Sequence, residues 1–146
     1  MLIKFNQKWA EEKYEQKIRE LIHFVKGSRR CADLLVKVFI YTKAKLRTKP
    51  SGNYRSLQIH GFYETESQYI SRGISSIITV KLPEDFSEQS FIYIFAHEWK
   101  HYLDFREKLD KNPYRWWEKR ANKFACKKVE EWKLFTSTAS RPQING

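Results

Sequence analysis

The sequence has little of the residues that shape secreted, fibrous or membrane-spanning proteins. Only five of its 146 residues are Gly and four are Pro, too few for a fibrous or loop-dominated chain. Two cysteines, Cys31 and Cys126, cannot build a disulfide framework. No apolar run approaches the roughly 18 residues of a membrane span, and residues 1–10 lack the apolar stretch of a signal peptide. These absences predict a cytoplasmic protein with no association with membranes.

Positive charge and aromatic side chains are abundant. Lys and Arg number 28 against 17 Asp and Glu, which gives a formal net charge of +11. Hydrophobic residues make up 41% and aromatic residues 16%, enough to bury a core, so general disorder is excluded. The length suits one domain. We expect a single domain over residues 1–135 and a flexible polar tail over residues 136–146, because the tail carries little apolar material.

The hydrophobic pattern predicts an α+β fold. Apolar residues recur at helical spacing over residues 6–26, with Asn6 as the expected N-cap and Gly27 as the stop. Three segments then read as strands, residues 34–41, 56–63 and 74–82. The period changes to that of a helix over residues 87–108, and a last helix is expected over residues 114–135, after Pro113. The order predicts a small sheet of three or four strands, antiparallel or mixed, with helices before and after it.

The first of the two C-terminal helices carries a metal-binding pattern. The segment His97-Glu98-Trp99-Lys100-His101 has the form His-Glu-x-x-His. Residues four apart project from the same face of a helix, so both imidazoles can hold one zinc ion while Glu98 takes a proton from a water molecule. Apolar residues surround the motif on most sides, which predicts a buried helix in which an unpartnered histidine pair would be costly.

The next helix offers a third ligand. Glu118, Ala121, Asn122 and Ala125 fall on one stripe, and the two alanines make a narrow face that would let this helix approach the histidine helix closely. Glu118 could then complete a three-ligand zinc site, with Asn122 hydrogen-bonding a ligating imidazole. The alternative is that Glu118 and Asn122 are ordinary solvent-facing residues.

At these residues the sequence resembles a known family. A His-Glu-x-x-His motif followed after 16 residues by Glu-x-x-Ala-Asn-x-Phe-Ala is similar to the ImmA/IrrE type of minimal gluzincin metallopeptidase, found in prokaryotes and their viruses. The resemblance covers about residues 90–130. It implies a zincin-like fold in which His97, His101 and Glu118 bind zinc and Glu98 is the general base. The bulky, charged Trp99-Lys100 pair departs from the family pattern.

Several features of the site stay open at this level. The segment 74–82 is the expected sheet edge beside the cleft, where an extended substrate would pair. Asp104 either supports the ligand His101 or is an ordinary helix charge. A donor is also needed for the developing oxyanion, and the sequence does not choose among five candidates, which are Tyr102, Tyr114, His60, Tyr63 and Arg72.

Two functions from different classes therefore compete. The first is a zinc metalloendopeptidase acting on a peptide or protein substrate, which the basic charge predicts to be acidic or associated with nucleic acid. The alternative is a basic nucleic-acid-associated or regulatory binding protein that keeps zinc for structure or has lost its activity. Loss of activity without Glu98 would favour the first, and affinity falling steeply with salt would favour binding to nucleic acid.

Overall fold

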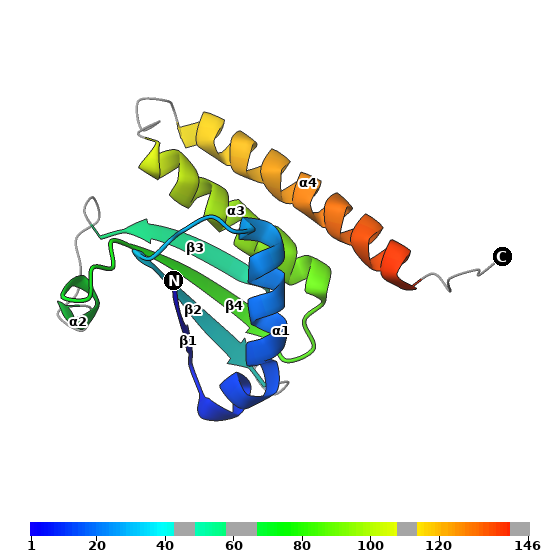
Figure 1. Ribbon diagram of the computed structural model, residues 1–146, viewed down its shortest axis with the longest axis horizontal. Helices are drawn as coiled ribbons and strands as arrows, with labels where there is room; N and C mark the ends of the chain where they lie inside the picture. The colour runs from blue at the N-terminus through cyan, green and yellow to red at the C-terminus, as the bar shows by residue number, and fades with distance from the viewer. Residues whose placement is uncertain (43–48, 58–66, 108–113, 141–146) are drawn as a thin grey trace.

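The computed structural model describes residues 1–42, 49–57, 67–107 and 114–140, which form a four-stranded sheet, three long helices and one helical turn (Figure 1). The elements follow in the order β1 (Leu2–Phe5), α1 (Lys8–Lys26), β2 (Leu34–Tyr41), β3 (Ser51–Ser56), α2 (Ser67–Ile70), β4 (Ser76–Pro83), α3 (Glu88–Arg106) and α4 (Tyr114–Ser140). The predicted α+β class and the small sheet are confirmed.

The sheet is mixed, and its strand order is β1-β2-β4-β3. Strands β1, β2 and β4 run parallel to one another, whereas β3 runs antiparallel to β4. The strand expected at the edge of the sheet, β4, therefore lies inside it, and that prediction is wrong. Strand β3 is the edge strand next to β4, and β1 is the edge strand on the other side. Strand β3 ends at Ser56, where the predicted strand 56–63 was to begin, and residues 58–63 lie outside the described ranges.

The first strand was not predicted, because only four residues contribute to it. Leu2 to Phe5 pair with Leu35 to Val38. Asn6, the expected N-cap of the first helix, extends this pairing instead. Its amide N–H donates to the Val38 carbonyl at 3.0 Å, and its side-chain Oδ1 accepts from the N–H of Ile40 at 3.1 Å. Helix α1 accordingly begins at Lys8, two residues later than predicted.

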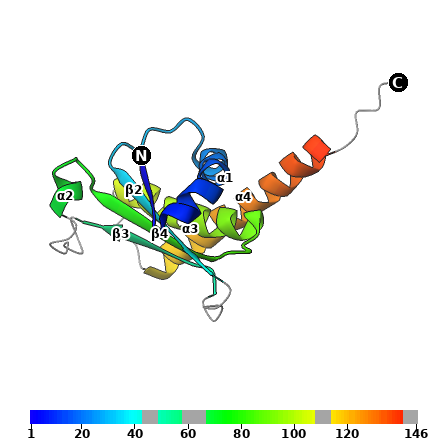
Figure 2. The ribbon, with the colours of Figure 1, turned by 90° about the horizontal axis from the view of Figure 1, so that it is seen from below.

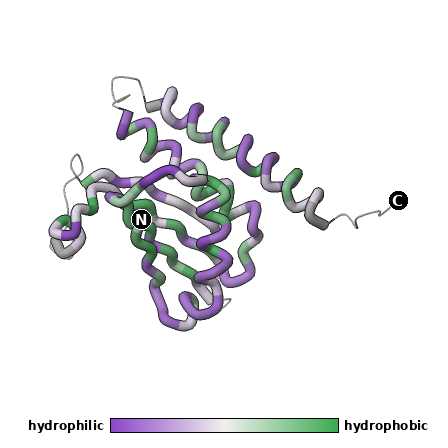
Figure 3. Tube along the Cα trace, viewed as in Figure 1, coloured by the Kyte–Doolittle hydropathy of each residue, from purple (hydrophilic) through white to green (hydrophobic). Residues whose placement is uncertain are grey.

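The main core lies between one face of the sheet and the helices α1 and α3. Alternate residues of β2 and β4 point into it, in keeping with the period of two in a strand, and they are Leu34, Val36, Val38, Ile40, Ile78, Val80 and Leu82. In Figure 3 hydrophobic residues gather on the strands, whereas along α4 they alternate with hydrophilic ones. This pattern fits a helix with only one face against the protein.

The helix ends follow local chemistry. Gly27 ends α1 with φ of 60°, in the left-handed region that glycine adopts at low cost. Ser87 caps α3, because its hydroxyl accepts from the N–H of Ser90 at 3.1 Å. Helix α4 continues to Ser140, so the first five residues of the predicted flexible tail are helical and that boundary is wrong. Its last turns project beyond the other elements (Figures 1 and 2).

None of the helices in the described part of the chain is both long enough and apolar enough to span a membrane.

Candidate metal centre

Helix α3 is enclosed by the sheet on one side and by α4 on the other. Ten of its 19 residues are buried, which confirms the prediction from its apolar pattern. Helix α4 lies beside it along its length (Figure 1) and presents Ala121 and Ala125, both fully buried, to the protein. The small side chains allow the close approach of the two helices that the sequence predicted. This close packing brings the side chains of His97 and His101 within reach of α4.

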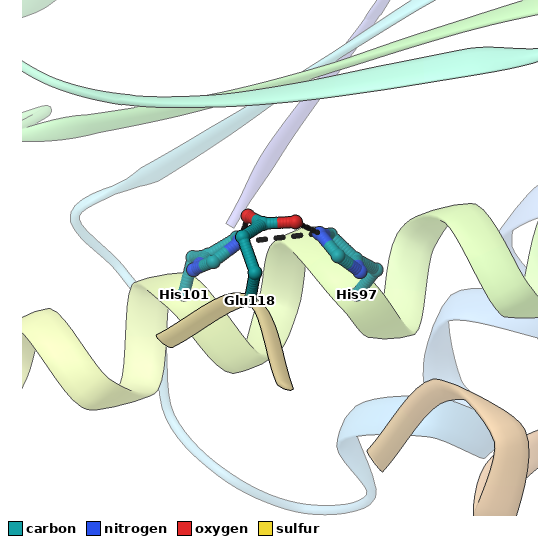
Figure 4. Close-up of side chains that lie close together, drawn as sticks. All are labelled: His97, His101 and Glu118. Atoms are coloured by element: carbon teal, nitrogen blue, oxygen red, sulfur yellow. Dashed lines mark hydrogen bonds and ion pairs between the residues drawn. The ribbon is translucent and has the colours of Figure 1, made fainter. Parts of the chain in front are cut away.

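Three potential ligand atoms meet between the two helices (Figure 4). His101 Nε2 lies 3.2 Å from His97 Nε2 and 2.8 Å from Glu118 Oε1, and His97 Nε2 lies 3.3 Å from Glu118 Oε2. The side chains of His97 and His101 are 14% and 11% exposed, and that of Glu118 is 32% exposed. The structure thus brings together the three residues that the sequence singled out as ligands.

The separations of these atoms fit a tetrahedral zinc ion. Bond lengths of about 2.0–2.1 Å imply that two ligands of such an ion stand about 3.3 Å apart. The two imidazoles at 3.2 Å and His97 and Glu118 at 3.3 Å are close to this value, whereas His101 and Glu118 Oε1 stand at the shorter hydrogen-bond distance of 2.8 Å. Two imidazoles and one carboxylate are also a donor set that zinc prefers. Among the described residues this is the one such group of histidine, cysteine and acidic side chains, and three protein ligands are the number that catalytic zinc sites use.

The electrostatics of the histidine pair favour ligation. Burial and the neighbouring His97 lower the pKa of the His101 imidazole, while Glu118 acts in the opposite sense. A lowered pKa keeps the ring neutral at pH 7, and only the neutral ring has a lone pair to give to a metal.

Glu98 lies on the same helix but faces the edge strand β3. Glu98 is only 8% exposed. Burial, reinforced by the charge of Glu118, raises the pKa of its carboxyl to about 7. No described residue donates a hydrogen bond to this carboxylate or pairs with it. No buried side-chain oxygen among the described residues lacks a hydrogen-bond partner, so the oxygens of this largely buried carboxylate still reach solvent and are open to an external partner such as water or substrate.

Strand β3 passes directly over Glu98. Gly52 has no side chain, and a Cβ atom placed there would stand 2.6 Å from Ile94 Cγ2, 3.0 Å from Glu98 Cγ and 3.3 Å from Glu98 Oε1. The sheet edge can therefore approach α3 this closely only where the strand carries glycine. The main chain of β3 and the carboxylate of Glu98 border the same space as a result.

Replacing Gly52 with Ala tests this close approach. The added methyl group must displace β3 or the side chains of Ile94 and Glu98, and we expect a cost of about 1–3 kcal/mol in the free energy of unfolding, as for other overpacked sites. Urea unfolding measures that cost. Gly73→Ala is a poor control because Gly73 has φ of 81°, so Ser51→Ala, at the exposed preceding position, is the matched variant. A stability equal to that of Ser51→Ala would contradict the packing described.

Asp104 holds the two helices together. It is fully buried, and it accepts from Lys100 of its own helix at 3.1 Å and from Arg120 of α4 at 3.1 and 3.2 Å. Arg120 also lies over the ring of Trp116 at 4.4 Å. Arg120 follows Glu118 by two residues. Its two hydrogen bonds to Asp104 therefore hold α4 against α3 close to Glu118. Asp104 is thus neither a direct support of His101 nor an ordinary surface charge.

The structure gives Asn122 a partner other than an imidazole. The hydroxyl of Tyr93 donates to Asn122 Oδ1 at 3.2 Å, and the Tyr93 ring stacks on His97 with centroids 6.4 Å apart. Sequence reasoning missed Tyr93, although its position four residues before His97 places it on the same face of α3. Tyr93 therefore links His97 to α4.

Of the five candidates for the oxyanion donor, the structure describes the side chains of two. The Tyr102 hydroxyl is occupied, because it donates to Asp33 and accepts from Arg106 at 2.9 Å. Arg72 is exposed in the turn after α2, which packs on the face of the sheet away from α3. His60 and Tyr63 lie outside the described residues, and so does the side chain of Tyr114. Cys31 is buried in the main core and Cys126 is exposed, and neither joins the three ligands.

Comparisons with known proteins give no relative from which to transfer a role. Neither family models, nor curated proteins, nor solved structures include a significant match to this chain.

Proposed function

We propose that this protein is a zinc-dependent peptidase of the minimal gluzincin type, with His97, His101 and Glu118 as ligands and Glu98 as the general base. The observation that carries the proposal is that two features lie side by side at the same turn of α3. One is the convergence of three ligand atoms within 4.8 Å of one another, and the other is the buried carboxylate of Glu98 with no described protein partner.

Each residue of the proposed site has a separate role. When bound, zinc would lower the pKa of a water molecule and polarise the carbonyl group of a peptide bond. Glu98 accepts the proton that this water loses and delivers it to the leaving amine, because a carboxyl with a pKa of about 7 gains and loses a proton readily near neutral pH. Buried Asp104 keeps Glu118 in place through Arg120.

The substrate would bind along the sheet edge. In the described chain β3 pairs only with β4, so its outer edge offers main-chain groups to an extended peptide, as in other cases of strand addition. Next to it a groove is lined by seven uncharged residues, Pro50, Ser87, Gln89, Ser90, Tyr93, Ile94 and Val129. In a chain with 31% charged residues, this lining favours a substrate with an uncharged side chain beside the bond that is cut.

The alternative of a purely structural zinc site is less well supported. Structural zinc sites are closed by four protein ligands, whereas catalytic sites use three and keep one position open. The described residues supply three. A structural site also gives no reason for the buried carboxylate of Glu98 beside it.

The direct test is peptide cleavage that depends on zinc. Protein purified without added metal or chelator is expected to contain about one zinc per chain, because three converging ligands suffice for tight binding. We expect it to cleave a random peptide library, with new N-termini identified by mass spectrometry. A chelator should abolish cleavage and zinc should restore it. No bound metal and no cleavage after zinc is added would refute the proposal, and bound zinc without cleavage would leave the structural alternative in its place.

A further inference from the structure

The two faces of the sheet are covered very differently. Helices α1 and α3 pack on one face, whereas the only described residues packed on the other form a small apolar cluster around α2 at one end of the sheet. Its members are Leu35, Leu57, Tyr69, Ile74 and Ile77, with Leu2 beside them. Figure 1 shows α2 at this end, away from the long helices. The rest of this face, here called the open face, carries no described helix.

The strand register identifies the side chains of the open face beyond the cluster. Lys4 of β1 lies opposite Lys37 of β2, and Lys37 lies opposite Thr79 of β4. Two residues further along, Phe39 lies opposite Lys81. Lys4 and Lys81 are exposed, and Lys37 and Phe39 are half-buried. Since residues two apart point to the same side of a sheet, the open face combines these three cations with an aromatic ring at its centre. Arg55 of β3, opposite Ile77 of the cluster, points to the same side of the sheet.

The cations of the open face have no acidic neighbour on the strands. The strand positions that point to this side hold no Asp or Glu. Lys4 donates to the Tyr69 hydroxyl at 2.8 Å, and the ammonium groups of Lys4 and Lys37 stand 5.0 and 5.7 Å from the centre of the same ring. A neutral ring leaves both charges in place, in contrast to Lys17, which pairs with Glu88 at 2.9 Å.

From this arrangement we infer that the open face binds single-stranded nucleic acid. Lysines spaced across neighbouring strands match the charges of a phosphate backbone, and an aromatic ring between them provides a surface on which a base can stack. Tyr41, half-buried and two residues beyond Phe39 on β2, extends the aromatic surface. A second copy of the chain is a poor occupant, because it would set cations against cations. The metal centre lies on the other side of the sheet, so both sites can be occupied together.

The test measures the binding of a labelled oligothymidylate of about 15 nucleotides, near the upper end of the usual site size for one domain. Fluorescence anisotropy over a range of salt concentrations should give a slope of log K against log[salt] of about −2, as expected for three phosphate contacts on a single strand. The double variant Lys37→Glu/Lys81→Glu should reduce the magnitude of this slope to about 0.7 or below. Phe39→Ala should weaken binding by about 5- to 150-fold, the loss of one stacked base.

Matched controls separate a defined surface from general charge. The double variant Lys123→Glu/Lys127→Glu makes the same charge change on the exposed side of α4 and should keep the wild-type slope. If the two double variants lost affinity for the oligothymidylate to the same extent, the inference would be overturned. It would also be overturned if the wild-type protein bound a duplex of the same length as tightly as the single strand. Binding to phosphatidylserine vesicles but not to the oligonucleotide would also overturn it. The metal content and the unfolding midpoint of each variant are measured to check that its fold persists. The outcome of the binding test does not depend on whether the protein is a peptidase.

Discussion

Glu98→Gln is expected to lower the rate of peptide cleavage by about 10²–10⁴-fold, the usual contribution of a general acid–base residue. The amide keeps the shape of the side chain but cannot accept the proton. Metal content should remain at the wild-type level, because Glu98 is not among the three converging ligand atoms. The folded state should be as stable as wild type or more so, since an amide carries no charge to bury.

The matched control for this substitution is Glu107→Gln. Glu107 is exposed at the C-terminal end of α3 and lies 3.5 Å from Arg29, so the same chemical change is made outside the centre. The measurement is the initial rate on a peptide selected from the library, with zinc content determined on the same samples. Cleavage by Glu98→Gln at more than about a tenth of the wild-type rate would rule out its role as the base.

Glu118→Ala is expected to weaken zinc binding by at least about 100-fold, more than the 10- to 100-fold loss typical of residues that only support a ligand. The variant leaves two imidazoles that are four residues apart on one helix, without the carboxylate that α4 brings within 2.8 Å of His101. Competition with a chromophoric chelator measures the affinity. Cleavage should fall with zinc occupancy and recover in part at high zinc concentration.

The control for the ligand is Glu130→Ala on the same helix. Glu130 is an exposed carboxylate that pairs with Lys133 at 3.3 Å, and such surface pairs contribute about 0–1 kcal/mol. Its removal should leave zinc affinity unchanged. If Glu118→Ala bound zinc as tightly as Glu130→Ala, Glu118 could not be a ligand, and the third position would have to come from another residue.

Local patterns predicted the ligand-bearing helices well. Ser87 and the apolar period gave the start of α3 to within one residue, and Pro113 gave the start of α4. The pairing of His97 and His101 followed from helical geometry, because a spacing of four residues places both side chains on one face of the helix. Glu118 required a further inference about how two helices pack, and the two alanines of α4 supplied it.

What the sequence could not provide were relations between distant segments. Strand β4 pairs with β2 over a separation of about 40 residues and with β3 on its other side, and no local signal distinguishes an inner strand from an edge strand of similar composition. The role of Asp104 was equally hidden, since its partner Arg120 is on another helix. The contact of Gly52 with Glu98 was hidden for the same reason, because it exists only once β3 has been placed beside α3.

On the proposed assignment, the division of the three ligands between two helices would give a bound metal a mechanical role. Two ligands belong to α3, which is part of the main core, while the third belongs to α4, whose last turns extend past the body of the protein. A ligand bound a thousandfold above its dissociation constant adds about 4 kcal/mol to the state that binds it. In the proposed site that energy would oppose the detachment of α4 rather than the unfolding of the sheet. Local opening of α4 would be the step that metal occupancy controls, and its amide hydrogens would exchange with solvent fastest in the apo protein.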